Sequence, residues 1–294
     1  MRLTLVLLAA VACYAQVSAR VSLSNGIQLT IATRSDNATP IALKTSLEPA
    51  SGDSFYRIFR DENNLVVFAY ELAVIIDHGM RRMLEQQVDE FYYITMMNEN
   101  YAQPSLPAGV LSADIIKGMY HYVSQPQQNS VLPIRLLGSG AILCEVIAAA
   151  ELLAQDWNVS SEVHSVTSFS ELARDAAAVQ RWNRLHPLES ARISHVEQQL
   201  QGAELIVAAS DYVRAYPQLI APYLEGRFIS LGTDGFGRSD TRLTLRRFFE
   251  VDRYSVVLAA LDALARMGSI PRQTVAQAIQ RYSIDTQTVA PWTR

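Results

Sequence analysis

The sequence predicts an α/β protein whose main part is a three-layer α/β/α domain with a mostly parallel sheet, preceded by a small β-rich segment. Beyond residue 104, short apolar runs alternate with longer amphipathic stretches, in the order strand, helix, strand, helix. Before residue 66, apolar and polar residues alternate with a period of two, which is typical of strands. The length of 294 residues allows about two domains.

The chain begins with a predicted leader at residues 1–19. Arg2, the apolar stretch 3–12 and the small residues Val17-Ser18-Ala19 are the three parts of a secretory signal peptide. The apolar stretch is shorter than the roughly 20 residues of a membrane span, and no later segment qualifies. Cys144 would be the single thiol after cleavage, whereas secreted domains often carry disulfides. The leader therefore indicates the secretory pathway, and the cysteine usage indicates the cytoplasm.

Residues 20–66 form the predicted β-rich segment. Apolar residues alternate on both sides of Asn25-Gly26, a strong hairpin signal. A second pair of strands is predicted at 55–59 and 65–68, around turn residues 61–64.

Residues 67–103 change to helical spacing over 72–86, and an apolar aromatic run follows at 91–97. This run suits a strand buried on both faces, and only the segment 20–66 offers it a partner within the chain.

Residues 104–294 form the predicted main domain. Ser168 with Glu171 is a capping box, Pro271 marks a helix start and Gly268 a helix end. Strands are predicted at 132–137, 162–167, 204–209 and 227–231, and helices at 140–156, 170–184, 190–200, 212–224, 241–250, 253–267 and 271–281.

A glycine-rich loop after the strand 227–231 is the first candidate site. It contains Asp234, Arg238, Asp240 and Arg242. Open parallel sheets bind ligands at the carboxyl ends of their strands, so this position suits function. The glycines allow the backbone to move, and the charged groups can exchange ion pairs as it does. The alternative is a solvated turn.

Two further strings lie at strand ends. Residues 98–101 follow the buried strand, where Glu99 is a general base only if it is desolvated, and turn or capping roles are commoner. Gly138-Ser139-Gly140 opens a helix, where an anion can bind, but it lacks the full dinucleotide fingerprint. A tight structural turn is the favoured interpretation.

Several classes of site are unsupported. The five histidines show no metal-binding spacing, and no Gly-x-Ser-x-Gly elbow occurs. A net charge of −4 without a basic run does not indicate a nucleic-acid partner. The sequence predicts no metal site.

Three strings, 98–101, 165–175 and 232–240, occur in an order and at separations that resemble the homodimeric pyruvate dehydrogenase decarboxylase. The resemblance covers its C-terminal region, from about residue 68 to 294. It implies a helix–strand remnant of the middle, pyrimidine-type domain at 67–103 and a transketolase C-terminal-like domain at 104–294. The implied ancestral activity is oxidative decarboxylation of pyruvate with acetyl transfer to lipoamide, using thiamine diphosphate and magnesium.

The resemblance implies roles at the rim of an active site rather than in its chemistry. Its mobile loop matches Asp234, Gly235, Gly237, Arg238, Ser239, Asp240 and Arg242. A secondary contact near the thiamine interface matches Asn98, Glu99, Asn100 and Tyr101. The family's activating glutamate and substrate-facing histidines precede the matched region, and its metal motif does not occur in this sequence, so no catalytic, cofactor-binding or metal residue is carried over.

The resemblance implies a homo-oligomer in the cytoplasm whose partner is the lipoyl acyltransferase component, and it predicts that this chain alone is inactive. Two alternatives stand beside this fragment interpretation. One is a secreted binding module that reuses the domain. The other is a chimeric gene model, joining an exported start to an enzyme fragment, with no independent function.

Overall fold

The computed structural model describes residues 61–96, 99–127 and 133–293, with 61–65 described by backbone alone, and the backbone of three short strands before them. Contacts divide the chain into two compact units, residues 1–103 (unit 1) and 104–294 (unit 2). Within the described residues, no helix has the length and apolar character needed to cross a membrane.

Unit 1 contains a parallel sheet in the order β1-β5-β4. β4 (Asp61–Leu65) leads through α1 (Ala69–Met80) and the π-helical turn η1 (Arg81–Glu85) to β5 (Phe91–Thr95). The predicted helix over 72–86 and the existence of the predicted strand at 91–97 are therefore confirmed. The strand is not buried on both faces, because burial alternates along β5 and Tyr93 is 41% exposed. β1 (Leu7–Ala9) pairs with the other edge of β5.

The turn predicted at 61–64 is wrong, because these residues are part of strand β4. They pair in parallel with β5 over five positions, from Asp61 opposite Phe91 to Leu65 opposite Thr95. Asp and Asn have low strand propensity, but pairing with a neighbouring strand outweighs a local preference of this size. Strand β5 thus pairs with one strand of the β-rich segment. The predicted strand at 55–59 lies outside the described residues.

The hairpin predicted around Asn25-Gly26 is confirmed by the backbone. β2 (Ser18–Ser22) pairs antiparallel with β3 (Gln28–Ala32), with Ser22 opposite Gln28. The connecting residues lie outside the described part of the chain.

Helix α1 packs closely on β5, and a side chain of its own first turn caps its amino-terminal end. A methyl group added at Gly79 would lie 3.0 Å from Cε2 of Tyr92, so a larger residue would displace the ring. The carboxylate of Glu71, which is fully buried, accepts hydrogen bonds from the backbone N–H groups of Val67 (2.7 Å) and Phe68 (3.0 Å). An acid in the first turn also suits the positive end of the helix dipole.

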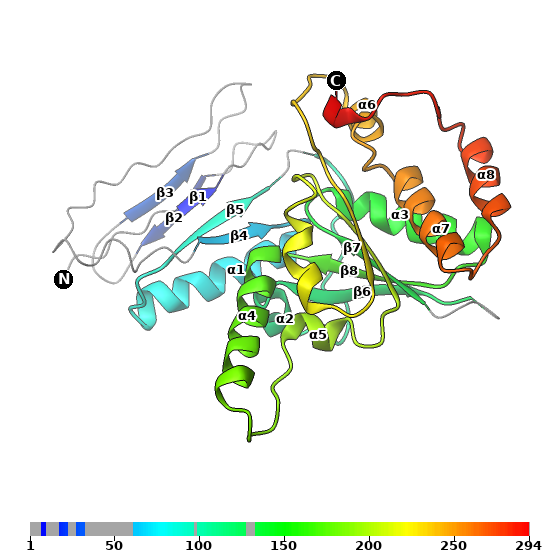
Figure 1. Cartoon of the computed structure of the whole chain (residues 1–294). Coiled ribbons are helices and arrows are strands. Elements are labelled where there is room, and N and C mark those ends of the chain that lie inside the picture. Colours follow the sequence, from blue (N-terminus) through cyan, green and yellow to red (C-terminus); the bar gives the residue numbers. More distant parts are fainter. Residues whose placement is uncertain are drawn as a thin grey trace. The chain divides into compact units, whose positions relative to one another are not determined.

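Unit 2 is built on a five-stranded sheet in the order β10-β9-β7-β8-β6 (Figure 1). The four strands predicted from sequence are confirmed and are mutually parallel: β7 (Ile134–Gly138), β8 (Ser161–Val166), β9 (Leu205–Ala209) and β10 (Arg227–Leu231). The fifth strand, β6 (Met119–Gln125), was not predicted and pairs antiparallel with β8.

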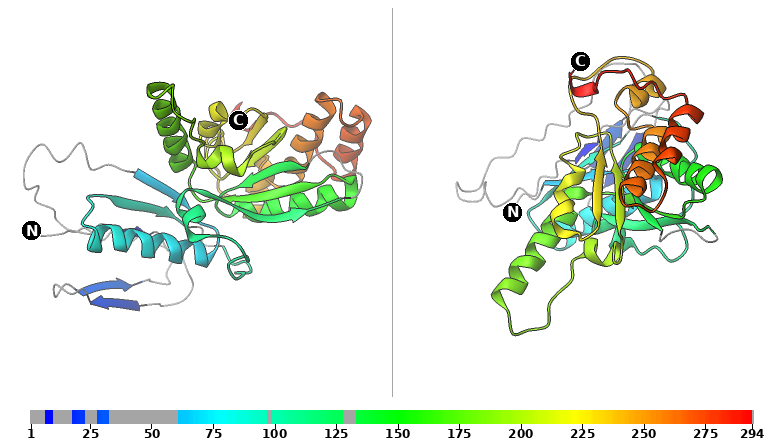
Figure 2. Two further views of the ribbon diagram at one scale, coloured as in Figure 1. Left: turned by 90° about the horizontal axis from the view of Figure 1, so that it is seen from below. Right: turned by 45° about the vertical axis from the view of Figure 1, so that its right-hand side comes forward.

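Helices cover both faces of this sheet, which gives the predicted three layers (Figure 2). One layer contains α3 (Ile142–Trp157), α7 (Arg253–Arg266) and α8 (Arg272–Arg281). The other contains α4 (Phe169–Leu185), α5 (His195–Gln199) and the 3₁₀ turn η2 (Pro217–Tyr223). All five residues of β9 are buried, so the core runs through the centre of the sheet.

Two predicted helices differ from the structure. The helix predicted at 190–200 begins only at His195, where Ser194 and Glu197 form a capping box. The helix predicted at 212–224 is the shorter turn η2, because Pro217 and Pro222 lack the N–H groups that an α-helix needs. The short helix α2 (Ser112–Ile116) was not predicted.

Helix α4 begins as predicted, although its capping box is only half formed. The Oγ of Ser168 accepts a hydrogen bond from the N–H of Glu171 at 3.2 Å. The carboxylate of Glu171 turns instead to the guanidinium of Arg174, one turn further along the helix. The cap therefore satisfies one of the free N–H groups at the start of the helix.

Candidate functional site

The carboxyl edge of the parallel sheet in unit 2 is the candidate position for a ligand site. From β7 the chain leads first to β8 on one side and later to β9 on the other. In open α/β sheets, ligands bind where the strand order reverses in this way. The segments after β7, β9 and β10 meet at this edge.

The turn Gly138-Ser139-Gly140 after β7 is tightly packed by the domain itself. Ser139 is fully buried, and its hydroxyl donates to Oγ of Ser210, after β9, at 2.9 Å. A methyl group added at Gly138 would lie 2.7 Å from Cα of Leu143. Gly140 has a φ of +56°, and a methyl group there would lie 3.2 Å from Oδ2 of Asp211. This is the tight structural turn that the sequence favours.

The glycine-rich segment 232–241, which we call the rim loop, follows β10 along the same edge. Its first half is held in place by Asp234. The backbone N–H of Arg214 donates to Oδ1 of Asp234 at 3.0 Å, and the Arg214 guanidinium forms an ion pair with Oδ2. The same guanidinium lies over the ring of Trp292, 4.2 Å from its centroid. Asp234 thus pairs with an arginine from outside the rim loop.

Gly235 is required where it stands. Its φ of +98° is strained for any other residue, and an added methyl group would lie 2.9 Å from Cα of Trp292 and 3.0 Å from the carbonyl oxygen of Pro291. Trp292 belongs to the C-terminal turn η3 (Pro291–Thr293), which therefore packs against the rim loop at Gly235. A methyl group at Gly232 would overlap the carbonyl oxygen of Tyr212, whereas one at Gly237 meets nothing within 4 Å, so packing constrains the first two of the three glycines in the rim loop.

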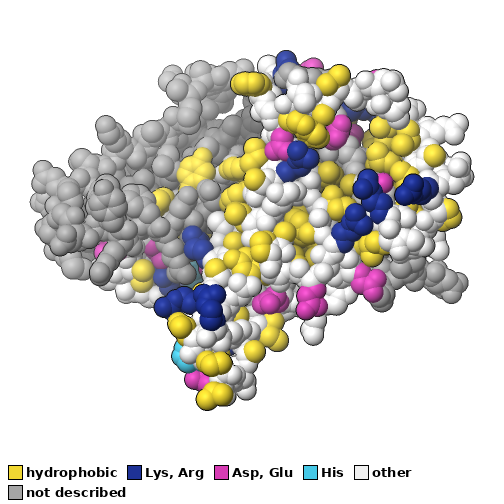
Figure 3. Space-filling model, viewed as in Figure 1, with side chains coloured by type: hydrophobic (Ala, Val, Ile, Leu, Met, Phe, Trp, Pro, Cys, Tyr) yellow, Lys and Arg dark blue, Asp and Glu magenta, His cyan; other side chains and the backbone are white. Residues whose placement is uncertain are grey.

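The second half of the rim loop faces solvent. Phe236 is 83% exposed, and Ser239 and Asp240 are also exposed. Arg238 lies over the ring of Phe248, 5.4 Å from its centroid. Where Figure 1 draws the segment after β10 beside η3, Figure 3 shows hydrophobic side chains next to both basic and acidic ones. The loop thus presents a mixed apolar and charged surface.

Helix α6 (Arg242–Phe248) continues directly from the rim loop. Thr241 caps it by accepting a hydrogen bond from the N–H of Thr244 at 3.3 Å, and Oδ1 of Asp240 accepts from the N–H of Thr241 at 2.6 Å. Arg242, the last of the predicted loop residues, is the first residue of this helix.

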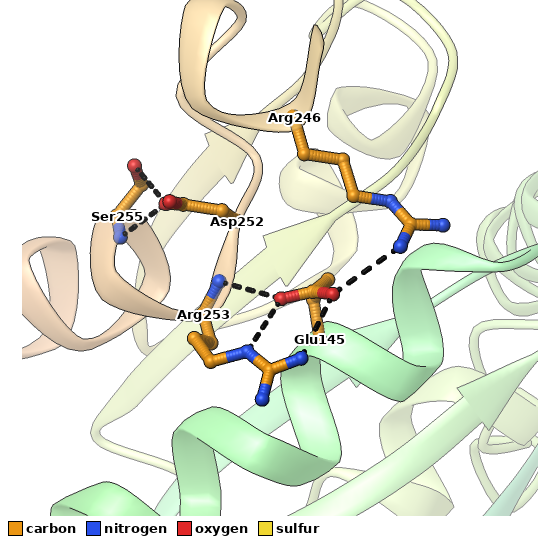
Figure 4. Close-up of polar contacts among 5 residues, drawn as sticks. All are labelled: Glu145, Arg246, Asp252, Arg253 and Ser255. Atoms are coloured by element: carbon orange, nitrogen blue, oxygen red, sulfur yellow. Dashed lines mark hydrogen bonds and ion pairs between the residues drawn. The ribbon is translucent and has the colours of Figure 1, made fainter. Parts of the chain in front are cut away.

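Sequence reasoning missed Glu145, which binds two arginines near the loop (Figure 4). Its side chain is 7% exposed on α3. Oε2 accepts hydrogen bonds from the backbone N–H and Nε of Arg253 at 3.0 and 2.8 Å. Oε1 accepts from Nη2 of Arg253 at 3.1 Å and from Nη1 of Arg246 at 3.3 Å. The signal available in the sequence is an acid placed among the apolar residues of a predicted helix.

The electrostatics of this cluster keep Glu145 ionised. Burial alone would raise the pKa of Glu145, but hydrogen bonds and charge from Arg253, together with the charge of Arg246, lower it below its ordinary value. The same partnership raises the pKa of Arg253. A buried acid with two arginines links three helices, α3, α6 and α7.

The second predicted contact, residues 98–101, belongs to unit 1. Asn98 lies outside the described residues, Asn100 is exposed and Glu99 is half-buried. The hydroxyl of Tyr101 donates to the carbonyl oxygen of Val67. The structure therefore gives Tyr101 a bond within its own unit.

Clusters of acidic, histidine and cysteine side chains are the remaining feature to consider. Across the described residues, no group of three or more His, Cys, Asp or Glu side chains converges in a way that could hold a metal ion.

Family models match two segments of the chain. The pyruvate dehydrogenase E1 component middle domain matches residues 58–104, and the transketolase-like C-terminal domain matches residues 118–252. The first match begins ten residues before Phe68, where the sequence comparison places the start of the resemblance. It includes β4, α1 and β5.

Curated relatives match the same region. Pyruvate dehydrogenase E1 components are 52% identical over 219 residues in Cupriavidus necator, 51% over 222 in Pseudomonas aeruginosa and 46% over 226 in Escherichia coli K12. These alignments cover 74–76% of this chain and 24–25% of each relative. The chain thus spans about a quarter of the length of these relatives.

Solved structures give weaker similarities. A Pichia stipitis transketolase complex with xylulose 5-phosphate has a TM-score of 0.49 and 14% identity, covering 74% of this chain and 27% of that one. An inactive β4 tetramer of a split-gene transketolase has a TM-score of 0.47 and 11% identity, covering 70% and 58%.

Proposed function

We propose that this chain, about three quarters of which aligns with pyruvate dehydrogenase E1 components, acts as the C-terminal part of a pyruvate dehydrogenase (acetyl-transferring) decarboxylase. The observation that carries the proposal is 52% identity over 219 residues with one such component. The second unit serves there in dimerisation and in forming the rim of the active site.

The position of the rim loop supports the rim role. It leaves the carboxyl end of β10, is held at Asp234 and Gly235, and exposes Phe236 and charged groups beyond them. An ordered base with an exposed tip suits a segment that closes over bound substrate or receives a carrier domain. In this proposal the carrier belongs to the lipoyl acyltransferase component of the pyruvate dehydrogenase complex.

We assign the chemistry itself to other regions of the family protein. Thiamine diphosphate and magnesium would bind there, and the cofactor would stabilise the carbanion formed from pyruvate. Residues of this chain would exclude water and position the incoming carrier. The 294-residue polypeptide alone is then inactive, and calorimetric titration with cofactor and magnesium should give no saturable binding. Micromolar binding would contradict this assignment.

The assembly and location follow the same proposal. A homo-oligomer in the cytoplasm fits the family role, and it requires that residues 1–19 do not direct export. Light scattering on the purified chain tests the first point. Amino-terminal sequencing of the expressed protein tests the second, because a leader cleaved after Ala19 would leave Arg20 as the first residue.

A chimera provides the direct test. Residues 104–294 replace the matching segment of the Cupriavidus necator E1 component, and the product is assayed for pyruvate decarboxylation and for acetylation of lipoyl domains. We expect both activities. Arg238→Ala and Asp240→Ala should lower lipoyl acetylation more than decarboxylation, whereas Arg266→Ala, in a surface pair with Asp262, should change neither. A folded chimera without decarboxylase activity would refute the family role.

A further inference from the structure

Helix α6 is poorly anchored by apolar burial. None of its seven residues, Arg242–Phe248, is buried. Helices in proteins gain most of their stability from a packed apolar face, and α6 lacks a fully buried one. Its polar contacts therefore contribute a larger share of the energy that fixes α6 on the domain. One contact that reaches the core helix α3 is the bond from Arg246 to Glu145.

The two arginines on Glu145 are held unequally. Arg253 makes three hydrogen bonds to the carboxylate, at 2.8, 3.0 and 3.1 Å. One of these uses a backbone N–H at the start of α7, where a nearby anion is favoured. To the same carboxylate Arg246 donates a hydrogen bond at 3.3 Å. Loss of the Arg246 bond therefore leaves Glu145 fixed on Arg253, and the site for Arg246 stays formed.

The joint after α6 is well defined. Glu250 has a φ of +57°, the left-handed conformation that commonly ends a helix and is strained for a residue with a side chain. The N–H of Val251 bonds the carbonyl oxygen of Arg246 at 2.9 Å across this turn. Beyond the turn Val251 is buried, and Asp252 caps α7 by accepting from the N–H of Ser255 at 2.9 Å. The fixed part of the chain thus resumes at Val251.

The rim loop and α6 therefore lie between two firm points, Asp234–Gly235 before them and Val251 after them. We propose that Arg246 and Glu145 form a latch that sets the position of the rim loop and α6, with Glu145 as a positioning residue. When the Arg246 bond is closed, α6 and the rim loop are held against α3. When it opens, they move together, because the Thr241 cap joins them. The latch itself does not depend on the proposed function; only the role of the rim loop at an active site rests on it.

Hydrogen exchange of the full chain, followed by mass spectrometry, tests the latch in the variant Arg246→Gln. We expect exchange of residues 236–249 to rise about tenfold, as suits the loss of one charge-assisted hydrogen bond. Exchange of α7 should not change. Glu145→Gln should raise exchange in both segments, because Arg253 loses its anchor as well.

The same helix offers a matched control. Asp156, near the other end of α3, holds Arg281 on α8 through Nε at 3.0 Å. Arg281→Gln should raise exchange in residues 272–281 and leave 236–249 unchanged. The latch is overturned if Arg246→Gln leaves the exchange of 236–249 within twofold of wild type, or if Arg281→Gln raises it equally.

Failure of the latch and failure of the proposed function are distinguishable. Exchange measures motion and requires no catalysis. In the active chimera, a loop freed by Arg246→Gln with unchanged lipoyl acetylation would refute the rim role and leave the latch standing. If Arg246→Gln leaves the exchange unchanged in a chimera that acetylates lipoyl domains, the latch is refuted and the rim role stands.

Discussion

Unit 2 should become less stable at mildly acidic pH, because the unfolded chain can protonate His164 and the folded chain cannot. The imidazole is 1% exposed on β8 and meets the ring of His121 on β6 edge to face, with centroids 5.4 Å apart. Burial, followed by the charges of His121 and of Arg135 on β7, lowers the pKa of His164 to about 3. Nearby backbone groups of Glu162 and Gln199 raise the pKa of His164 but do not cancel this shift.

The direction and size of the effect follow from linkage. An unfolded histidine has a pKa near 6.5, so above that pH the imidazole is neutral in both states and stability does not depend on it. Below about 6.5 the unfolded chain binds a proton that the folded chain excludes, and the free energy of unfolding falls by about 1.4 kcal/mol per pH unit, down to about pH 3. At pH 5 the loss is about 2 kcal/mol.

Urea unfolding of the full chain at pH 7 and pH 5 measures this loss. The variant His164→Gln removes the titrating group, so wild type should lose about 2 kcal/mol more than the variant between the two pH values. His121→Gln, at the exposed partner, should keep most of the wild-type loss. Equal losses in wild type and His164→Gln would refute the reasoning.

The other predictions concern packing and domain boundaries. Gly235→Ala should destabilise by about 1–3 kcal/mol, because it is strained at positive φ and meets η3, whereas Gly237→Ala should stay within about 0.5 kcal/mol in thermal or urea unfolding. Tyr282→Phe should cost about 1–2 kcal/mol, because the hydroxyl accepts from Trp157 and donates to Asp156, both at 2.8 Å, and an effect below 0.3 kcal/mol would contradict this. Residues 104–294 alone should unfold cooperatively on heating, since they hold a complete sheet with helices on both faces, and a molten product would show that unit 1 is needed.

The parallel strands of unit 2 could be predicted because their sequences carry the signal of full burial. β9 is five apolar residues long and is buried throughout, as a central parallel strand must be. β6 gives no such signal. It forms the edge of the sheet and mixes buried Met119 and Tyr120 with exposed His121, so it lacks the continuous apolar run of a central strand.

Errors elsewhere arose where tertiary pairing outweighs local preference. Residues 61–64 have turn composition, yet β5 provides a complete set of hydrogen-bonding partners over five positions. In η2, Pro217 and Pro222 shorten a segment whose apolar spacing resembles a helix. Here the sequence itself holds the contrary signal, because two prolines within six residues disfavour an α-helix despite the apolar periodicity.

The candidate site shows the same division. The glycines and strand end located the rim loop, and Gly235 confirms that one of them is required by backbone geometry. The groups that restrain the loop are remote in sequence: Arg214 and Trp292 at its start, and Glu145 through Arg246 at its end. Periodicity shows that Glu145 lies in an apolar helix, but not which arginine more than 100 residues later it meets.

These unequal restraints determine which end of the loop moves. Separating Asp234 from Arg214 breaks an ion pair and a backbone hydrogen bond, and also disturbs the stacking on Trp292. Releasing the other end breaks the 3.3 Å bond from Arg246 to Glu145 and bends the chain at Glu250, which is already in a left-handed turn. We expect the motion to pivot at Asp234 and to swing α6 outward. Exchange in Arg246→Gln should accordingly rise more at residues 242–249 than at 233–235, and a uniform rise would place the pivot outside the rim loop.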